Sequence, residues 1–295
     1  MSQPGVLQLA DELGPRGRRR VRIATAISAV IVAGVLYVAF QRLSDRGQLE
    51  WDKWEPFTQW SVVKFLAGGL GDTVRAAGAA MVLALVLGTA LALMRLSRVA
   101  PVRWFAAAFI EFFRGVPLIL LIFFTFFGLR NYDVDIDPYQ SLVVALGIYN
   151  GAVLGEIFRA GIRSLDPGQS EAAWSLGLGY WPTMRLVVVP QAIRRMIPAV
   201  ISQLVTLLKD TSLGFVITYP ELLRRSRSTG EFFANPLQTT VIVAVVYIIV
   251  NYALGRLARW LEGRQRRRLG AGQMVVTGVE DLSATSAAGT ASVAN

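Results

Sequence analysis

The chain has 295 residues, of which 54% are hydrophobic, and its mean hydropathy is +0.47. These values lie outside the usual range of soluble domains, in which about 45–50% of residues are apolar. Because the sequence contains no Cys and no His, disulfide frameworks, Cys/His metal sites and imidazole acid–base chemistry are excluded. A formal net charge of +10 is also typical of proteins that bind nucleic acid. The basic residues, however, gather at the ends of apolar runs, where membrane topology explains them. We therefore expect a membrane lipid environment, no nucleic acid, no metal and no catalytic residue.

Apolar residues occur in runs of about 20, the length that crosses ~30 Å of hydrocarbon as a helix. Backbone polar groups in lipid must be satisfied within the segment, so these runs predict an all-α integral membrane protein. No small-residue cleavage site follows the first run, which we interpret as an anchor rather than a signal peptide. In chain order the six predicted spans are Ile23–Phe40, Thr73–Met94, Phe105–Phe127, Ser141–Phe158, Pro198–Thr218 and Leu237–Leu254.

Arginine residues set the predicted orientation, because positive residues favour the cytoplasmic side. Arginines are concentrated at 16–22, before the first span, and at 264–268, after the last one. Both termini are therefore expected in the cytoplasm, and the Asp-containing loop 130–138 is expected outside. One loop opposes this scheme, since 221–233 must be external and yet carries three arginines. These arginines are Arg224, Arg225 and Arg227. They either cap an external gate or indicate that a span is miscounted.

The chain lacks the usual device for binding ATP. A phosphate loop needs the pattern GxxxxGK[ST], but the only three lysines are Lys53, Lys64 and Lys209, and none follows a glycine. The spans also lack the carboxylate runs of a proton pump. We expect no cofactor on this chain, and if transport is active its energy comes from a partner.

The segment between the fourth and fifth spans, by topology cytoplasmic, is polar at its start and is interrupted by glycine. Asp166 before Pro167 predicts a helix N-cap, and Gln169 three residues after the Asp completes a predicted capping box. A short helix should follow over 171–174, break at Gly177 and Gly179, and give way to a second helix that begins at Pro182.

Two short helices that meet at a glycine corner predict a compact knob with exposed apolar side chains around the bend. These side chains are Trp174, Leu176, Leu178 and Trp181. An exposed aromatic surface on the cytoplasmic side is a candidate docking site for a partner. The alternative is an interfacial helix whose tryptophans lie at the headgroup level.

The residues of this knob resemble a known motif. The segment reads Glu-Ala-Ala with a glycine four residues after the second alanine, and an aliphatic-x-aliphatic-Pro pattern follows. It resembles the EAA loop of binding-protein-dependent ABC importer permeases. In that family the loop is the coupling helix that fits a groove on the ATPase subunit. The coupling residues implied by the resemblance are Gln169, Glu171, Ala172, Ala173, Gly177 and Pro190.

The resemblance covers about residues 66 to 262 and points to the polar amino-acid branch of the family. It rests on "EFFRGVPLILLIFFTFFGL", "GEIFRAGIRSLDPGQSEAAWSLGL", "PQAIRRMIPAV" and "LLKDTSLGFVITYPEL". The added N-terminal span resembles glutamate-importer permeases of actinobacteria. Departures are small: Val187 and Val189 replace the more usual Ile and Leu, and "RGVPL" replaces "RGTPL".

The resemblance implies a type I ABC importer permease fold in a bacterial cell membrane. The expected partners are an ABC ATPase subunit that holds the ATP, an extracytoplasmic amino-acid-binding protein and a second permease subunit, which we expect to be a different chain. The expected domains are a cytoplasmic tail (1–22), an extra membrane anchor (23–40), an external amphipathic segment (41–65), the permease domain (66–262, with its coupling loop at 164–190) and a basic, then disordered tail (263–295).

Polar residues inside the fifth span are costly in lipid and need a cavity or a partner. The run Lys209, Asp210, Thr211 and Ser212 therefore either lines the translocation path or locks the span to its neighbours, and both interpretations stay open. Asn150 in the fourth span is a further path candidate, although interhelical hydrogen bonding explains it better. Local ion pairs are expected for Glu111 with Arg114 and for Glu156 with Arg159, each three residues apart.

Two other classes of function compete with an ABC permease. A self-contained secondary carrier or channel would need an inverted repeat with broken helices in both halves, and the sequence shows neither. The other is a membrane scaffold without transport activity. Co-purification of an ATPase would favour the permease, and transport by this chain alone would favour the carrier.

Overall fold

A computed structural model describes residues 14–257, 259, 260 and 263 of the chain. The chain divides into two units, Met1–Thr58 and Gln59–Asn295. The predicted boundary between residues 65 and 66 lies inside a helix that begins at Trp60. The predicted disordered tail and the arginines at 264–268 lie outside the described residues.

The first unit consists of one long helix and two short 3-10 helices. Helix α1 (Pro15–Asp45) begins within the segment that was predicted to be a tail, and its most apolar window is long enough to cross a membrane. None of that window is buried within the structure. Its apolar side chains are therefore left for lipid or a partner. The 3-10 helices η1 (Trp51–Lys53) and η2 (Glu55–Thr58) follow it.

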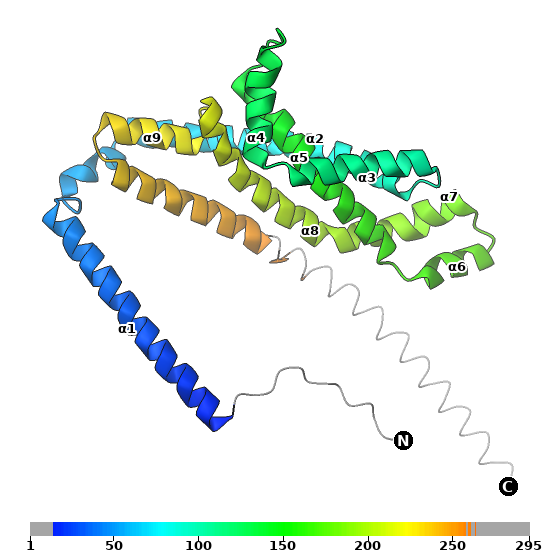
Figure 1. The fold of residues 1–295 in the computed structure, drawn as a ribbon, viewed down its shortest axis with the longest axis horizontal. Coiled ribbons are helices and arrows are strands. Elements are labelled where there is room, and N and C mark those ends of the chain that lie inside the picture. Colours follow the sequence, from blue (N-terminus) through cyan, green and yellow to red (C-terminus); the bar gives the residue numbers. More distant parts are fainter. Residues whose placement is uncertain (1–13, 258, 261–262, 264–295) are drawn as a thin grey trace. The chain divides into compact units, whose positions relative to one another are not determined.

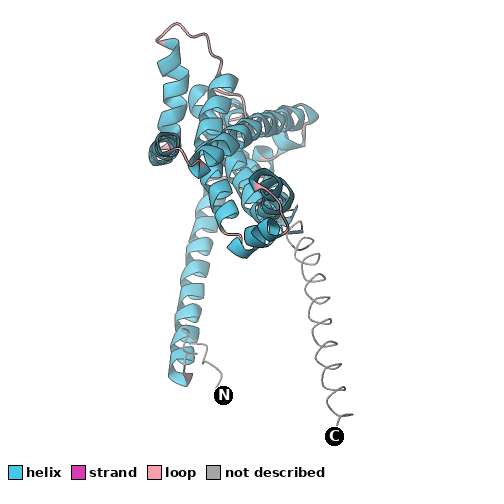
Figure 2. Ribbon diagram, turned by 90° about the vertical axis from the view of Figure 1, so that its right-hand side faces the viewer, coloured by secondary structure: helices cyan, strands magenta, loops and turns pink. Residues whose placement is uncertain are grey.

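The second unit is helical throughout its described part, as Figures 1 and 2 show. Together with α1 of the first unit, five helices in the described residues are long and apolar enough to span a membrane, or six if a bent pair is counted as one span. The predicted all-α membrane fold is confirmed. The elements are α2 (Trp60–Leu96), α3 (Ala100–Gly115), α4 (Leu118–Phe123), η3 (Phe124–Gly128), α5 (Pro138–Arg163), α6 (Pro167–Ser175), α7 (Tyr180–Thr183), η4 (Met184–Val188), α8 (Val189–Asp210), η5 (Thr211–Ile217), α9 (Leu222–Phe232) and a last helix Pro236–Leu257.

The predicted third span, Phe105–Phe127, is not one straight helix. Helix α3 ends at Gly115, and the segment Leu118–Gly128 continues at an angle of 100° to it. The cause is local: Pro117 has no N–H to donate, and the residue before a proline avoids the helical region. Val116 accordingly has an extended backbone, with φ −79° and ψ 129°.

The predicted fifth span, Pro198–Thr218, begins too late. Helical structure runs without a break from Tyr180 to Ile217, and only its last part, η5, tightens to a 3-10 helix. The helix therefore joins the polar run at residues 209–212 directly to the segment that resembles the coupling loop.

The core of the second unit is a close contact between α2 and α5. On α2 the side chains of Ala76, Ala80 and Ala84 are fully buried. At Gly88 an added Cβ would lie 2.8 Å from the Cβ of Leu154 and 3.0 Å from the carbonyl oxygen of Gly151. Such small residues let two helix backbones approach closely, which is the usual device of membrane helices. This pair forms the frame on which α8 and the loop before it are mounted.

Candidate functional site

The loop between α5 and α8 begins with the predicted N-cap. The Oδ1 atom of Asp166 accepts a hydrogen bond of 2.8 Å from the backbone N–H of Gly168, and Pro167 opens α6. The predicted capping box is wrong. The side chain of Gln169 does not reach back to the cap; its Oε1 accepts a hydrogen bond of 3.2 Å from Nε2 of Gln191 on α8. Gln169 thereby ties α6 to α8.

The predicted glycine corner is present, and Gly177 is the residue that makes it. Its φ is +80°, a left-handed conformation that costs little only for glycine. The N–H of Gly177 donates to the carbonyl of Trp174 (2.9 Å), and the N–H of Leu178 donates to the carbonyl of Ala173 (3.1 Å). These two bonds form a Schellman motif, which satisfies the last carbonyls of α6 and fixes the direction of the chain toward α7.

The second helix of the loop starts at Tyr180, two residues before the predicted start at Pro182. One π-helical turn, η4, then joins α7 to α8. Pro190 lies in the first turn of α8 and has no N–H for a regular helical bond to the preceding turn. A π turn before it accommodates the missing bond. Pro190 therefore sets the junction of the loop with the fifth span.

The surface of this knob is apolar and exposed. Trp174 is 51% exposed, Leu176 83% and Trp181 78%, whereas Leu178 is only partly exposed. Glu171 and Ala172 also face solvent, but Ala173 is buried against the base of the loop. The motif therefore has an outer face, with the carboxylate and the aromatic rings, and an inner face that packs.

Charged side chains fasten the base of the knob to the span bundle. Arg195 on α8 donates a hydrogen bond of 2.6 Å to the carbonyl oxygen of Ser164, at the end of α5. The predicted pair of Glu156 with Arg159 is confirmed at 2.7 Å, and Arg95 of α2 joins the same carboxylate at 3.3 Å. These contacts connect α2, α5 and α8 next to the loop. Motion of the loop would therefore be passed to three helices.

A cation–π contact joins the turn after α2 to the loop. The guanidinium carbon of Arg98, in the turn between α2 and α3, lies 5.7 Å from the centre of the Tyr180 ring. The predicted pair of Glu111 with Arg114 is absent from the described residues. Both of those residues are exposed on α3, so neither charge needs a partner to replace its hydration.

Asn150 is fully buried in α5. Its Nδ2 donates a hydrogen bond of 2.9 Å to the carbonyl of Leu146, and its Oδ1 accepts one from Nε2 of Gln203 on α8. Both polar atoms of the amide are thus engaged. Asn150 links α5 to α8 in this structure and presents no free group to a ligand.

The polar run at the end of α8 divides into two faces. Thr211 is fully buried, and its hydroxyl donates to the carbonyl of Leu208 at 2.7 Å. Lys209 and Ser212, three residues apart, both line an open groove of about 570 Å³. Asp210 is half-buried between the two faces. Within the described residues, no carboxylate lies within ion-pair distance of Lys209.

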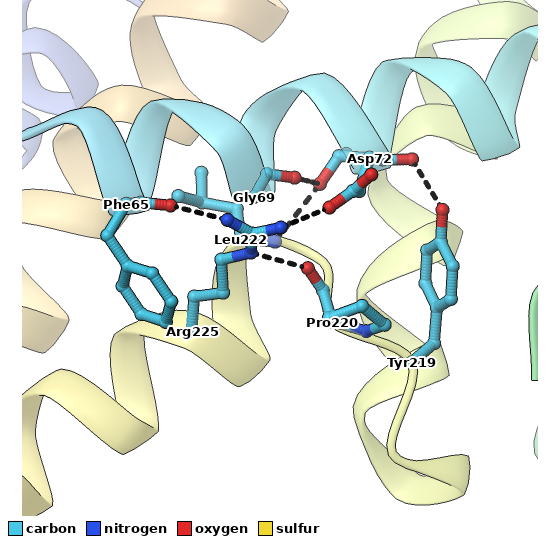
Figure 3. Close-up of polar contacts among 8 residues, drawn as sticks. Phe65, Gly69, Asp72, Tyr219, Pro220, Leu222 and Arg225 are labelled. Carbon is cyan, nitrogen blue, oxygen red and sulfur yellow. Dashed lines mark hydrogen bonds and ion pairs between the residues drawn. The ribbon is translucent and has the colours of Figure 1, made fainter.

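The segment after η5 is held against the first half of α2, and Arg225 makes most of the contacts (Figure 3). Its guanidinium pairs with the carboxylate of Asp72 and donates to the carbonyls of Phe65 (2.9 Å) and Pro220 (3.0 Å). The hydroxyl of Tyr219 donates to the carbonyl of Asp72 at 2.9 Å. The arginines of the loop 221–233 thus belong to a short helix between two spans.

Glu221 is a buried carboxylate that the sequence analysis did not single out. It caps α9 by accepting from the backbone N–H groups of Leu223 (2.8 Å) and Arg224 (2.6 Å), and the hydroxyl of Tyr247 donates to it at 2.9 Å. Burial raises the pKa of the Glu221 carboxyl above its ordinary value, against the opposing effect of these bonds. Glu221 connects α9 to the last helix and so supports one wall of the groove.

Comparison with known proteins agrees with this architecture. Residues 84–267 match the family described as binding-protein-dependent transport system inner membrane components. The chain belongs to this family. It is therefore a membrane-embedded subunit of a transport system, of a family whose members are permeases and not enzymes.

Individual relatives are similar over most of their length. The glutamate transport system permease protein GluD of Corynebacterium glutamicum is 38% identical over 238 residues, 77% of this chain and 86% of that protein. The glutamate/aspartate import permease protein GltK of Escherichia coli is 33% identical, over 68% of this chain and 93% of that protein. The crystal structure of an amino acid ABC transporter with histidines shares a TM-score of 0.67 at 30% identity and covers 70% of this chain and 97% of that one.

Proposed function

We propose that this chain is the permease subunit of an ATP-driven amino-acid importer and that its loop 164–190 couples it to a separate ATPase subunit. The observation that supports this most directly is the knob of α6 and α7. Its outer face exposes Trp174, Leu176 and Trp181, while its base is fastened to the bundle. An exposed aromatic surface on a rigid base is suited to docking and to passing on a partner's motion.

The proposed substrate is a polar or acidic amino acid such as glutamate. Support comes from the relatives, since GluD and GltK are both named for glutamate transport. An extracytoplasmic binding protein would deliver the amino acid and do most of the selecting. ATP would be held and hydrolysed by the partner ATPase.

The proposed orientation places both termini and the knob in the cytoplasm of a bacterial cell. It rests on the arginines at the N-terminal end of α1 and those around the turn between α2 and α3, because positive residues favour that side. The loop that contains α9 is then external, and Arg225 clamps it to α2.

The translocation path is proposed to run beside Lys209 and Ser212, with Asp210 at its edge. Lys209 and Ser212 line the open groove, where an ammonium and a hydroxyl would meet a carboxylate. Thr211 and Asn150 are fully buried and are bonded to the protein. Of the five path candidates, these two are therefore assigned to helix packing.

The coupling role is tested by changing the knob without disturbing the spans. Glu171→Lys reverses a charge on the exposed face. Gly177→Pro removes the N–H that bonds Trp174 and cannot adopt a φ of +80°, since proline fixes φ near −65°. We expect both variants to insert and assemble but to lose ATP-driven uptake of glutamate in proteoliposomes. Uptake at the wild-type rate in either variant would contradict the proposal.

Gly179→Ala is the matched control within the same loop. Its φ is −72°, and an added Cβ would meet only the Cδ of Pro182 at 3.9 Å. The substitution is therefore free of strain. We expect near-normal uptake, so that a loss in Gly177→Pro can be assigned to the corner rather than to any change in the loop.

A further inference from the structure

The open groove beside Lys209 has a wall that the sequence analysis did not consider. The last helix contributes one continuous face to it: Thr240, Val243, Ala244, Tyr247, Ile248 and Asn251. Steps of three and four residues place these side chains in a single stripe along the helix. Eleven residue steps separate Thr240 from Asn251, which is about 16 Å at ~1.5 Å per residue. The groove is thus long enough to contact a small molecule along part of its way across the membrane.

Asn251 is the one amide in this stripe, and its carbonyl oxygen is unsatisfied. The Nδ2 atom donates a hydrogen bond of 2.7 Å to the backbone carbonyl of Tyr247. This bond fixes which way the amide points, because only the NH₂ group can donate. The Oδ1 atom therefore takes no part in that bond; it is buried from solvent and has no hydrogen-bond partner among the residues that the structure describes. A buried acceptor without a partner costs free energy, so the site favours a ligand that can donate.

The other wall of the groove carries the complementary group. Lys209 and Ser212 come from the end of α8 and the start of η5. The described residues offer Lys209 no carboxylate to pair with. The remaining lining is mainly apolar, with Leu223, Val243 and Ile248, and such surroundings strengthen any charged contact made within them. The groove therefore holds a donor for a carboxylate and an acceptor for an ammonium, the two groups that every amino acid carries.

We infer that a rotation of the Asn251 side chain opens its Oδ1 to the groove, where it accepts a hydrogen bond from the ammonium group of the amino acid as it passes. Lys209 then attracts the carboxylate end, either at the same moment or at an earlier point of the passage. The inference rests on the proposed transport function and adds a specificity-determining residue from the last helix. It also explains why a costly unpaired oxygen is kept in an otherwise apolar stripe.

Two variants of Asn251 separate its acceptor from its donor. Asn251→Leu removes both, whereas Asn251→Asp keeps an acceptor of the same shape and loses the N–H that bonds Tyr247. The assay is uptake of radiolabelled L-glutamate by proteoliposomes that contain the permease with its ATPase, any sister permease and saturating binding protein. Melting temperature and yield of the complex are measured alongside.

We expect Asn251→Leu to lower the maximal uptake rate about tenfold or more, the effect of losing one hydrogen bond to a charged group. The half-saturating concentration of binding protein should stay unchanged. Asn251→Asp should keep at least half of the wild-type rate. Equal losses in both variants would mean that the bond to Tyr247 is what matters, and the inference would be overturned. Wild-type uptake in Asn251→Leu would overturn it as well.

Folding and the underlying function are controlled separately. If Asn251→Leu does not assemble, Asn251→Ala, which adds no bulk, replaces it with the same expected loss. If the wild-type complex takes up no L-glutamate at all, the proposed function fails and the inference fails with it. Normal wild-type uptake together with an unaffected Asn251→Leu rejects only the role of Asn251.

Discussion

At the scale of single residues, the polar run of the fifth span shows how helix geometry separates neighbours. Adjacent residues on a helix point in different directions. Thr211 faces the core and bonds its own backbone, whereas Lys209 and Ser212 face the groove. We therefore propose the path role for Lys209 and Ser212 and the lock role for Thr211.

Lys209→Met tests the path at this scale, because it keeps the apolar stem and removes the charge. Lys209 forms no ion pair in the described residues, and its charge acts only at longer range on the neighbouring carboxylate of Asp210, so the complex should fold. A hydrogen bond to a charged group is worth about 1.5–3 kcal/mol, so uptake per folded complex should fall roughly ten- to a hundredfold. Lys209→Arg, which keeps the charge, should retain most of the rate.

The measurement combines the yield of folded complex with uptake by the folded fraction. Normal uptake by well-folded Lys209→Met would remove Lys209 from the path. A loss of folded protein would instead point to a lock, with a partner contributed by another subunit.

Other residues at this scale could not be predicted, because their partners are distant in sequence. Asp72 and Arg225 pair across 153 positions, and nothing near Arg225 in the sequence announces a carboxylate. Glu221 appears in the sequence only as an acid before a helix. Its burial and its bond to Tyr247 follow from the packing of the last helix. For Asp72 a signal was available, because it is the one carboxylate in the largely apolar sequence of α2 and such a group needs a partner.

At the scale of elements, local sequence predicted local structure well. The Asp166 cap, the corner at Gly177 and the two short helices depend on residues close in sequence, and all are present. The capping box failed because Gln169 found a partner on α8. A box with the same spacing forms instead at Asp137 and Gln140, at the start of α5.

Hydrophobic runs predicted the spans but not their shape. The run Phe105–Phe127 has an even apolar content, so hydropathy alone cannot show the bend of 100° within it. The Gly-Val-Pro sequence that begins at Gly115 was the usable signal, since the residue before a proline leaves the helical region. Contacts between elements far apart in sequence, such as that of α2 with α5, depend on tertiary packing. Hydropathy along the sequence therefore could not predict them.

The contact of α2 with α9 gives a prediction with an internal control. At Gly69 an added Cβ would lie 2.9 Å from the Cα of Leu222, a backbone atom that cannot rotate away. Gly69→Ala should therefore push α9 off α2 and lower the melting temperature of the complex. At Gly71, on the same helix, nothing lies within 4 Å of such a Cβ. Gly71→Ala should be neutral or stabilise by up to about 1 kcal/mol. Equal melting temperatures for the two variants would contradict this close packing.

At the scale of the whole molecule, the chain leaves much apolar surface for its surroundings. Val82, Val86 and Leu93 of α2 are each more than 60% exposed, and several apolar side chains of the last helix are between 38% and 66% exposed. Lipid covers part of such a surface. Within the part of the chain that the structure describes, the groove beside Lys209 has walls from α8, η5, α9 and the last helix alone. A path for a charged substrate must be closed from lipid on all sides, so we expect a second permease to supply the missing wall.

The last prediction concerns the identity of that second permease. The resemblance to glutamate importers favours a different chain over a second copy. Native mass spectrometry of the detergent-solubilised complex, expressed from its own gene cluster, distinguishes the two. Two copies of this chain would contribute 2 × 32.3 = 64.6 kDa, whereas the expected complex contains one copy of 32.3 kDa and one sister of different mass. Dissociation in the gas phase identifies each subunit directly. Detection of two copies and no sister would refute the prediction, and the groove of Asn251 and Lys209 would then be present twice, related by a twofold axis.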